Sequence, residues 1–241
     1  MSPERRKIVL TTEWPKAAMD ALRGDYELVV ALGGPGSADF AAALTGAEAF
    51  CPVYYDRIDS ALIAALPASI RIIASFGVGT DHIDLQAAAK RGLPVSNTPD
   101  VLTDDTADIA IGLMIAASRG FSEREHALRA GQWKGPSITG DLWQSFSSKT
   151  LGIVGLGRIG AAVARRAKAF GMRLLYTSPS HKPALEEELG LAYREHLSEL
   201  LADSDFVSLH TPLNASTRHL IDAGRLAQMK SSGVLVNTGR G

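Results

Sequence analysis

The feature that most constrains the fold of this chain is a glycine-rich turn at residues 155–160. The segment reads Gly155-Leu156-Gly157-Arg158-Ile159-Gly160, and a β-rich run, Thr150–Val154, comes directly before it. A helical pattern follows to Phe170, and another β-rich run begins at Arg173. A GxGxxG segment alone is a weak signal because glycine is common. Between a strand and a helix, with a second strand about twenty residues on, it indicates a dinucleotide-binding βαβ unit.

Each glycine of this turn has its own predicted role. Gly155 permits the tight turn, Gly157 lets the backbone approach a pyrophosphate, and Gly160 lets the helix pack closely on the strand. The helix N-terminus would then offer unpaired N–H groups to the phosphates. The alternative is an ordinary strand–helix turn that binds nothing.

The alternation of strands and helices extends over most of the chain. We expect strands at residues 8–12, 26–30, 48–53, 70–75, 94–97, 150–154, 173–176, 205–210 and 234–237. Strands that alternate with helices indicate parallel βαβ units. The sequence therefore predicts an α/β protein with one domain in residues 1–98 and a second in residues 99–241.

A long apolar helix is predicted at the start of the second domain. Thr103 is a suitable N-cap, and Asp104 and Asp105 would lie in the positive first turn. The helix is hydrophobic on most faces as far as Ser118, so we expect it to be buried on several sides. Residues 132–149 show no clear period and are predicted to form a connecting arm.

Charge and composition exclude several classes of partner. The formal net charge of −1 argues against nucleic acid or an anionic membrane as the main partner. The longest apolar run, residues 109–117, is too short for a membrane span, and residues 1–7 have no signal-peptide pattern. The single cysteine, Cys51, reads as a buried strand residue and fits a reducing cytoplasm. None of the six histidines has zinc-ligand spacing, so we expect no metal.

The residues after the second strand of the βαβ unit bear on the choice between NAD and NADP. An acid there would bind the ribose 2′-hydroxyl and repel a 2′-phosphate. The segment from Tyr176 to Lys182 contains no acid, and its hydroxyls with His181 and Lys182 could hold a 2′-phosphate. It could also be only a polar turn. We favour NADP slightly over NAD.

Two further segments are candidates for binding an acidic substrate. A glycine-rich loop, Ser75–Asp84, follows a predicted strand, and the N–H groups of Val78 and Gly79 could hold a carboxylate there. The alternative is a simple turn in which Asp84 caps the next helix. Arg240, just after the last strand, could pair with a carboxylate and polarise a carbonyl, or could simply be solvated.

These segments together resemble the D-isomer-specific 2-hydroxyacid dehydrogenases. The matching stretches occur in family order, and they are Ser75–Asp84, Asn97–Pro99, Thr103–Asp108, Leu151–Gly160, His210–Leu213 and Val236–Gly241. The chain is most similar to the glyoxylate/hydroxypyruvate reductase branch. It departs from that branch at Pro179, where those enzymes often carry an arginine for the 2′-phosphate.

The resemblance implies two flavodoxin- or Rossmann-like domains with a cleft between them, and a homodimer formed through the long helix and the arm. It places the substrate carboxylate on Val78 and Gly79, and it matches Arg240 to the catalytic arginine. It assigns Arg158 and Ile159 to the pyrophosphate and Ser178 to the adenosine ribose. The other residues that it assigns to the cofactor are Thr106, Thr211, Pro212, Thr217, Thr238, Gly239 and Arg240.

The family's catalytic Glu and its partner His, the proton donor, lie beyond the position of Arg240. We therefore expect an N-terminal part of the family fold, with an incomplete second domain and weak or no turnover. The activity implied for the parent is hydride transfer between NAD(P)H and the carbonyl of a small 2-oxo acid, giving a D-2-hydroxy acid. The alternatives are a non-catalytic dinucleotide sensor on the same fold and a formate- or phosphite-type dehydrogenase.

Overall fold

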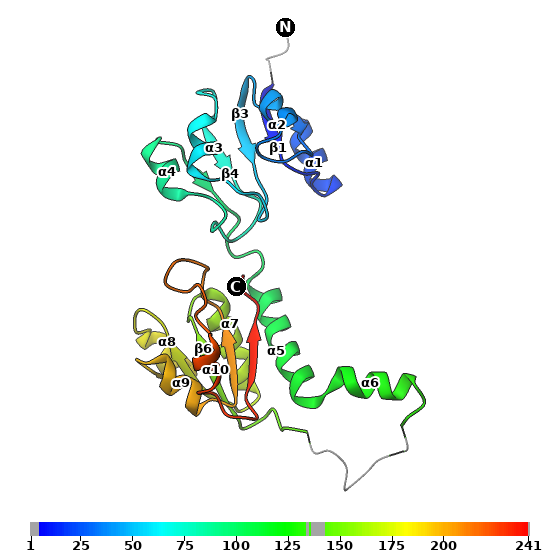
Figure 1. Ribbon diagram of the computed structural model, residues 1–241, viewed down its shortest axis with the longest axis vertical. Helices are drawn as coiled ribbons and strands as arrows, with labels where there is room; N and C mark the ends of the chain where they lie inside the picture. Colours follow the sequence, from blue (N-terminus) through cyan, green and yellow to red (C-terminus); the bar gives the residue numbers. More distant parts are fainter. Residues whose placement is uncertain (1–4, 134, 136–142, 241) are drawn as a thin grey trace. The chain divides into compact units, whose positions relative to one another are not determined.

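The computed structural model describes residues 5–133, 135 and 143–240 of the chain (Figure 1). The chain forms two compact units, Met1–Val101 and Leu102–Gly241. The expected domain boundary, after residue 98, lies just before this division. Each unit is described separately below.

The first unit contains a five-stranded sheet in the order β2-β1-β3-β4-β5, and every strand pair in it is parallel. This is the flavodoxin-like order, in which the strand order reverses between β1 and β3. The strands are β1 (Arg6–Leu10), β2 (Tyr26–Val30), β3 (Ala47–Cys51), β4 (Ile72–Ala74) and β5 (Val95–Ser96).

Helices cover both faces of this sheet. On one face, Met19 packs against Leu10 and Cys51, and on the other face Phe40 and Ile63 join a larger apolar cluster. The helices are α1 (Lys16–Arg23), α2 (Ala38–Ala43), α3 (Ser60–Ala65) and α4 (Leu85–Lys90). The Asp84 side chain accepts a hydrogen bond from the Ala87 N–H and so caps α4 as predicted.

The second unit contains another five-stranded parallel sheet, in the order β10-β9-β6-β7-β8. The strands are β6 (Thr150–Val154), β7 (Arg173–Thr177), β8 (Leu191–Tyr193), β9 (Phe206–Leu209) and β10 (Val234–Asn237). The strand order reverses between β6 and β9, as in Rossmann-type sheets. The edge strand β8 is absent from the strands expected from the sequence, since Leu191–Tyr193 is too short to show a period.

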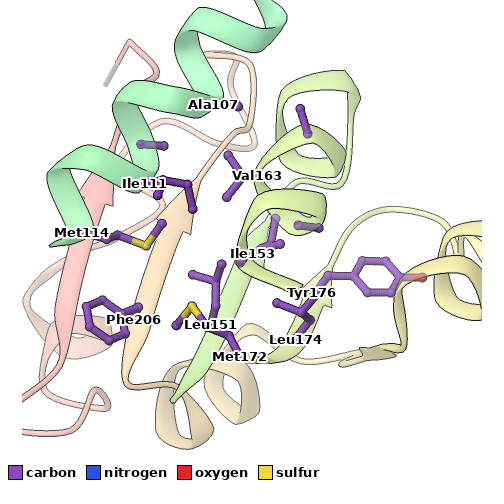
Figure 2. Close-up of a cluster of buried hydrophobic side chains, with 14 of the residues drawn as sticks. Ala107, Ile111, Met114, Leu151, Ile153, Val163, Met172, Leu174, Tyr176 and Phe206 are labelled. Atoms are coloured by element: carbon purple, nitrogen blue, oxygen red, sulfur yellow. The ribbon is translucent and has the colours of Figure 1, made fainter. Parts of the chain in front are cut away.

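Alternate residues of β6 enter different cores. Leu151 and Ile153 contact α5 (Thr103–Arg119) and α7 (Arg158–Ala169) in the cluster of Figure 2, and Val154 packs with α9 (Leu197–Asp203) on the other face. This alternation is the two-residue period of a strand buried on both faces. The remaining helices are α6 (Phe121–Arg129), α8 (Pro183–Leu189) and α10 (Ala223–Leu226).

Two expectations for the long helix α5 are wrong. Leu102 occupies the N-cap position, so Thr103 is the first helical residue and no side chain caps the helix. Only one face is buried: Ala107 and Met114 are fully covered, whereas Ile109 and Leu113 are 60% and 46% exposed. Part of the expected arm, residues 134 and 136–142, lies outside the described residues.

Among the described residues, no helix is long and apolar enough to cross a membrane. The same residues include no group of three or more His, Cys, Asp or Glu side chains arranged to hold a metal ion.

Candidate functional site

The first glycine of the turn at residues 155–160 is required by the backbone. Gly155 has φ +94°, and a Cβ atom there would lie 2.8 Å from the carbonyl oxygen of His210. The Gly155 N–H also donates to the carbonyl of Thr177 at 2.9 Å. The turn therefore lies against both β7 and the segment after β9, where the strand order reverses and such sheets bind ligands.

The other two glycines differ in what surrounds them. A Cβ atom on Gly160 would collide with the Gly155 carbonyl oxygen, so this position holds α7 close to the turn. A Cβ atom on Gly157 would meet nothing within 4 Å. Gly157 is also the N-cap of α7 and supplies no side-chain cap, so the open space lies where the helix N–H groups begin. This arrangement fits the phosphates of a dinucleotide.

The imidazole of His210 connects the two strands beside the glycine turn. Its Nε2 lies 2.8 Å from the hydroxyl of Ser208, which is fully buried, and its Nδ1 lies 3.4 Å from the hydroxyl of Thr238. Burial lowers the pKa of His210 from 6.5 to about 4. The ring is therefore neutral at physiological pH, with one nitrogen donating and the other accepting.

The segment after β9 forms a tight turn held by Thr217. Its hydroxyl donates to the Pro212 carbonyl at 2.5 Å and accepts from the Asn214 N–H at 2.9 Å. A hollow of about 190 Å³ brings together Thr211, Pro212, Thr217 and Arg240, and its lining includes no residue of the glycine turn. Four of the predicted site residues therefore lie together in this unit.

Arg240 follows a short, ordered segment after β10. The Gly239 N–H donates to the Asn237 side chain at 2.8 Å, and a Cβ atom on Gly239 would lie 3.6 Å from the Thr211 carbonyl. Residues 238–240 therefore lie beside the turn after β9. Arg240 itself is exposed.

Side-chain contacts hold the segment after β7, for which the sequence predicted only a polar turn or a 2′-phosphate site. The imidazole of His181 packs on the ring of Tyr193, with centroids 3.7 Å apart, and its Nδ1 lies 3.2 Å from Glu186. The Ser178 hydroxyl donates to the Ser180 carbonyl at 2.5 Å. In this arrangement the hydroxyl hydrogen is used, and the Ser178 oxygen is available to accept a hydrogen bond from a ribose.

A hydroxyl–carboxylate pair, formed by the buried Tyr176 and the half-buried Glu186, holds the start of α8 beside this segment. The Tyr176 hydroxyl donates to Glu186 at 2.5 Å and accepts from the Lys182 N–H at 2.8 Å. Burial, followed by the bond to Glu186, raises the pKa of Tyr176 to about 12, and the same bond lowers the pKa of Glu186. An acid therefore lies near the expected 2′-phosphate position, although none lies in the segment itself.

In the first unit, Val78 and Gly79 lie in a loop held from one side. The Thr98 N–H donates to the Gly77 carbonyl at 3.0 Å, and the Asn97 side-chain amide donates to the Val78 carbonyl at 2.7 Å. Within the described chain, neither Val78 N–H nor Gly79 N–H donates a hydrogen bond. The loop can therefore offer two backbone donors to an anion.

Two other features of the first unit do not involve Val78 or Gly79. The larger hollow there, about 430 Å³, is lined by residues 54–59 and 81–84 and not by Val78 or Gly79. Cys51 is buried in β3, and burial raises the pKa of its thiol to about 12, which makes it unsuited to act as a nucleophile.

The sequence predicts no site role for Asn97, Tyr193 or Ser208. Asn97 lies inside a stretch that matches the family. The sequence feature that could have identified it is an amide side chain at the end of a predicted strand. Tyr193 lies on β8, the strand that the sequence did not indicate. For Ser208 we find no sequence signal, because its role depends on the partner at His210.

Two parallel sheets, one with a glycine turn at its strand-order reversal, define a two-unit α/β protein of the dinucleotide-binding class. The family model for the NAD-binding domain of D-isomer specific 2-hydroxyacid dehydrogenases matches residues 111–241, which is more than half of the chain. The chain therefore belongs to the D-isomer-specific 2-hydroxyacid dehydrogenase family and has the NAD(P)-binding domain of that family.

Curated relatives and solved structures agree with this assignment. A glyoxylate reductase from Thermococcus kodakarensis is 48% identical over 198 residues, covering 80% of this chain and 59% of the relative. A glyoxylate reductase from Thermococcus gammatolerans is 40% identical, and the match covers 98% of this chain and 72% of the relative. A crystal structure of a glyoxylate reductase from Paecilomyes thermophila matches with a TM-score of 0.86 at 38% identity. This match covers 98% of this chain and 74% of the solved chain. The chain thus spans about three fifths of the length of the first of these relatives.

Proposed function

We propose that this protein reduces the carbonyl of a small 2-oxo acid, of the glyoxylate or hydroxypyruvate type, to a D-2-hydroxy acid with NAD(P)H. The observation that carries the proposal is the pair of N–H groups at Val78 and Gly79, which have no acceptor in the described chain and can bind a carboxylate. The family assignment and the similarity to glyoxylate reductases support the choice of substrate.

The proposed roles divide between the two units. Val78 and Gly79 bind the substrate carboxylate, and Arg240 pairs with the same group and polarises the carbonyl. Gly155, Gly157, Arg158, Ile159 and Gly160 hold the pyrophosphate at the start of α7. Ser178 holds the adenosine ribose, and the adenosine side is completed by Thr211, Pro212 and Thr217. Thr238 and Gly239 lie beside the nicotinamide, and Thr106 lies near the cofactor at the start of α5. The reduced nicotinamide, when bound, supplies the hydride.

We propose a slight preference for NADP over NAD. Lys182 and His181 lie after β7, and Lys182 adds a positive charge where a 2′-phosphate would bind. The contact between His181 and Glu186 opposes this, because the carboxylate repels a phosphate. We therefore expect both cofactors to bind.

The proposal also includes a homodimer and a cytoplasmic location. Ile109 and Leu113 of α5 and Phe121 and Leu128 of α6 are between 46% and 60% exposed, an unusual amount of apolar surface for two adjoining helices. The single buried thiol fits a reducing compartment.

Binding tests the proposal without requiring turnover. The 241-residue chain is titrated with NADPH and NADH by nicotinamide fluorescence, and then with oxamate, an unreactive analogue of a 2-oxo acid, in the presence of cofactor. We expect both cofactors to bind and oxamate to bind the chain–cofactor complex. Cofactor binding without any oxamate binding would contradict the proposal and favour the dinucleotide sensor.

A substrate panel separates the enzymatic alternatives. Oxidation of NADPH or NADH is measured with glyoxylate, hydroxypyruvate and pyruvate, and reduction of the oxidised cofactors is measured with formate and phosphite. We expect any turnover to be fastest with glyoxylate or hydroxypyruvate. Turnover confined to formate or phosphite would contradict the proposed substrate class.

A further inference from the structure

The loop that carries Val78 and Gly79 has an unusual backbone arrangement. Gly77 has φ +151°, a value that favours glycine, and the next two peptide groups both turn their carbonyls toward residues 97–98. In an extended strand, successive carbonyls would point in opposite directions. The loop is therefore shaped so that two successive peptide groups face the same way.

The direction of the carbonyls fixes the direction of the N–H groups. No peptide bond in the described chain is cis, and in a planar trans peptide the N–H points opposite to the C=O. The peptide that ends in the Val78 N–H is held through the Gly77 carbonyl, and the peptide that ends in the Gly79 N–H is held through the Val78 carbonyl. Both N–H groups thus point away from residues 97–98.

The two peptide groups are held by different kinds of donor. The Gly77 carbonyl accepts from the Thr98 backbone N–H at 3.0 Å, which no side-chain substitution removes. The Val78 carbonyl accepts from the Asn97 side chain at 2.7 Å, which is the shorter bond. A hydrogen bond to a carbonyl also polarises its peptide and strengthens the N–H on the other side as a donor.

We propose that Asn97 is a positioning residue for the substrate. Its side-chain amide orients and polarises the Val78–Gly79 peptide so that the Gly79 N–H donates to the substrate carboxylate. This inference rests on the proposed function, since it requires that the loop binds a carboxylate. Asn97 acts through the peptide and needs no contact of its own with the substrate.

The surroundings of Asn97 fit this role better than a structural one. The side chain is exposed, and it follows the short edge strand β5 rather than packing in the core of the unit. Removal of its amide therefore leaves the sheet and the Thr98 bond in place. The expected consequence is local, at the Gly79 N–H.

The test is an NMR titration of the 241-residue chain, labelled with ¹⁵N and saturated with NADPH, with oxamate as the probe. In the parent chain we expect the Val78 and Gly79 amide signals to shift together as oxamate binds. In Asn97→Ala we expect the Kd for oxamate to rise about tenfold, because one charge-assisted hydrogen bond loses its alignment. The Gly79 shift at saturation should shrink while the Val78 shift is kept.

Two further variants complete the experiment. Asn97→Asp keeps the size of the side chain, removes the donor and adds repulsion, so it should weaken oxamate binding more than Asn97→Ala does. Ser96→Ala changes the preceding exposed side chain and should bind oxamate as the parent does. The Kd for NADPH should be unchanged in all three variants, a result that a general loss of folding would not give.

The outcomes distinguish this inference from the proposed function. If the parent signals shift and Asn97→Ala and Asn97→Asp bind oxamate as tightly as the parent, the positioning role is overturned and the carboxylate site stands. If the Val78 and Gly79 signals do not respond in the parent chain, the carboxylate site itself is overturned, and the inference with it.

Discussion

The Nε2 atom of His210 lies 2.8 Å from the hydroxyl oxygen of Ser208, a fully buried residue two positions earlier in the chain. The other ring nitrogen faces the Thr238 hydroxyl, so one half-buried imidazole spans the ends of β9 and β10. Both contacts can be satisfied by a neutral ring, and burial holds the pKa of His210 at about 4.

This pKa predicts a pH-dependent stability. Between the ordinary pKa of 6.5 and the folded value of about 4, the unfolded chain binds a proton that the folded chain does not. The stability due to the neutral ring is complete above pH 6.5 and is lost as the pH falls toward 4. By this mechanism the second unit should lose about 2 kcal/mol between pH 7 and pH 5.

The matched variant for this prediction is His210→Asn, which keeps polar atoms but does not titrate. Urea unfolding of parent and variant at the two pH values measures the effect, and the difference between them isolates His210 from the carboxylates. Identical pH dependence in parent and variant would show that the imidazole is not held neutral.

The stability of the second unit should be sensitive to alanine at Gly160 and insensitive to alanine at Gly157. A methyl group on Gly160 would collide with the Gly155 carbonyl, which is backbone and cannot move aside cheaply, so Gly160→Ala should destabilise the unit by about 2 kcal/mol. A methyl group on Gly157 meets nothing, so Gly157→Ala should change stability by less than about 0.5 kcal/mol.

Cofactor binding, unlike stability, should be sensitive to substitution of Gly157. Gly157→Ala should raise the Kd for NADPH about tenfold or more, because the methyl group occupies the approach of the pyrophosphate. Urea unfolding and fluorescence titration on the same samples measure both effects. A Gly157→Ala variant that binds cofactor normally would place the phosphates elsewhere.

Lys182 should discriminate between the two cofactors. Lys182→Ala removes a positive charge from the segment after β7 and should weaken NADPH binding about threefold to tenfold while leaving NADH binding unchanged. Lys90→Ala, a loss of the same charge in the first unit, is the control. Equal weakening of both cofactors by Lys182→Ala would mean that this lysine does not face a 2′-phosphate.

The exposed apolar residues of α5 predict self-association. Leu113→Arg places a charge on that face and should convert a dimer to a monomer in analytical ultracentrifugation, because a buried unpaired charge is strongly unfavourable at an interface. Leu32→Lys, on an equally apolar exposed position of the first unit, should leave the assembly unchanged. A monomeric parent chain, or a dimer that survives Leu113→Arg, would exclude this interface.

The sequence alone determined the fold class and the place of the cofactor turn. Strands such as Thr150–Val154 are apolar throughout, and glycines punctuate the helices, so local composition already specifies parallel βαβ units. The need for glycine at positions 155 and 160 was also predictable, because the spacing of the glycines between a strand and a helix indicates it. The short strand β8 and the uncapped start of α5 could not be predicted, because the sequence shows no periodic pattern for the strand and no capping pattern at Leu102 for the helix.

The tertiary structure decided what the side chains near the site do. The pairing of His181 with Glu186, the contact of His210 with Thr238 and the Asn97 bond to Val78 each join groups from different segments. Periodicity carries no information about such contacts, because they depend on register and loop geometry. The sequence supplied the candidate donors at Val78 and Gly79, and the fold determined which way they point.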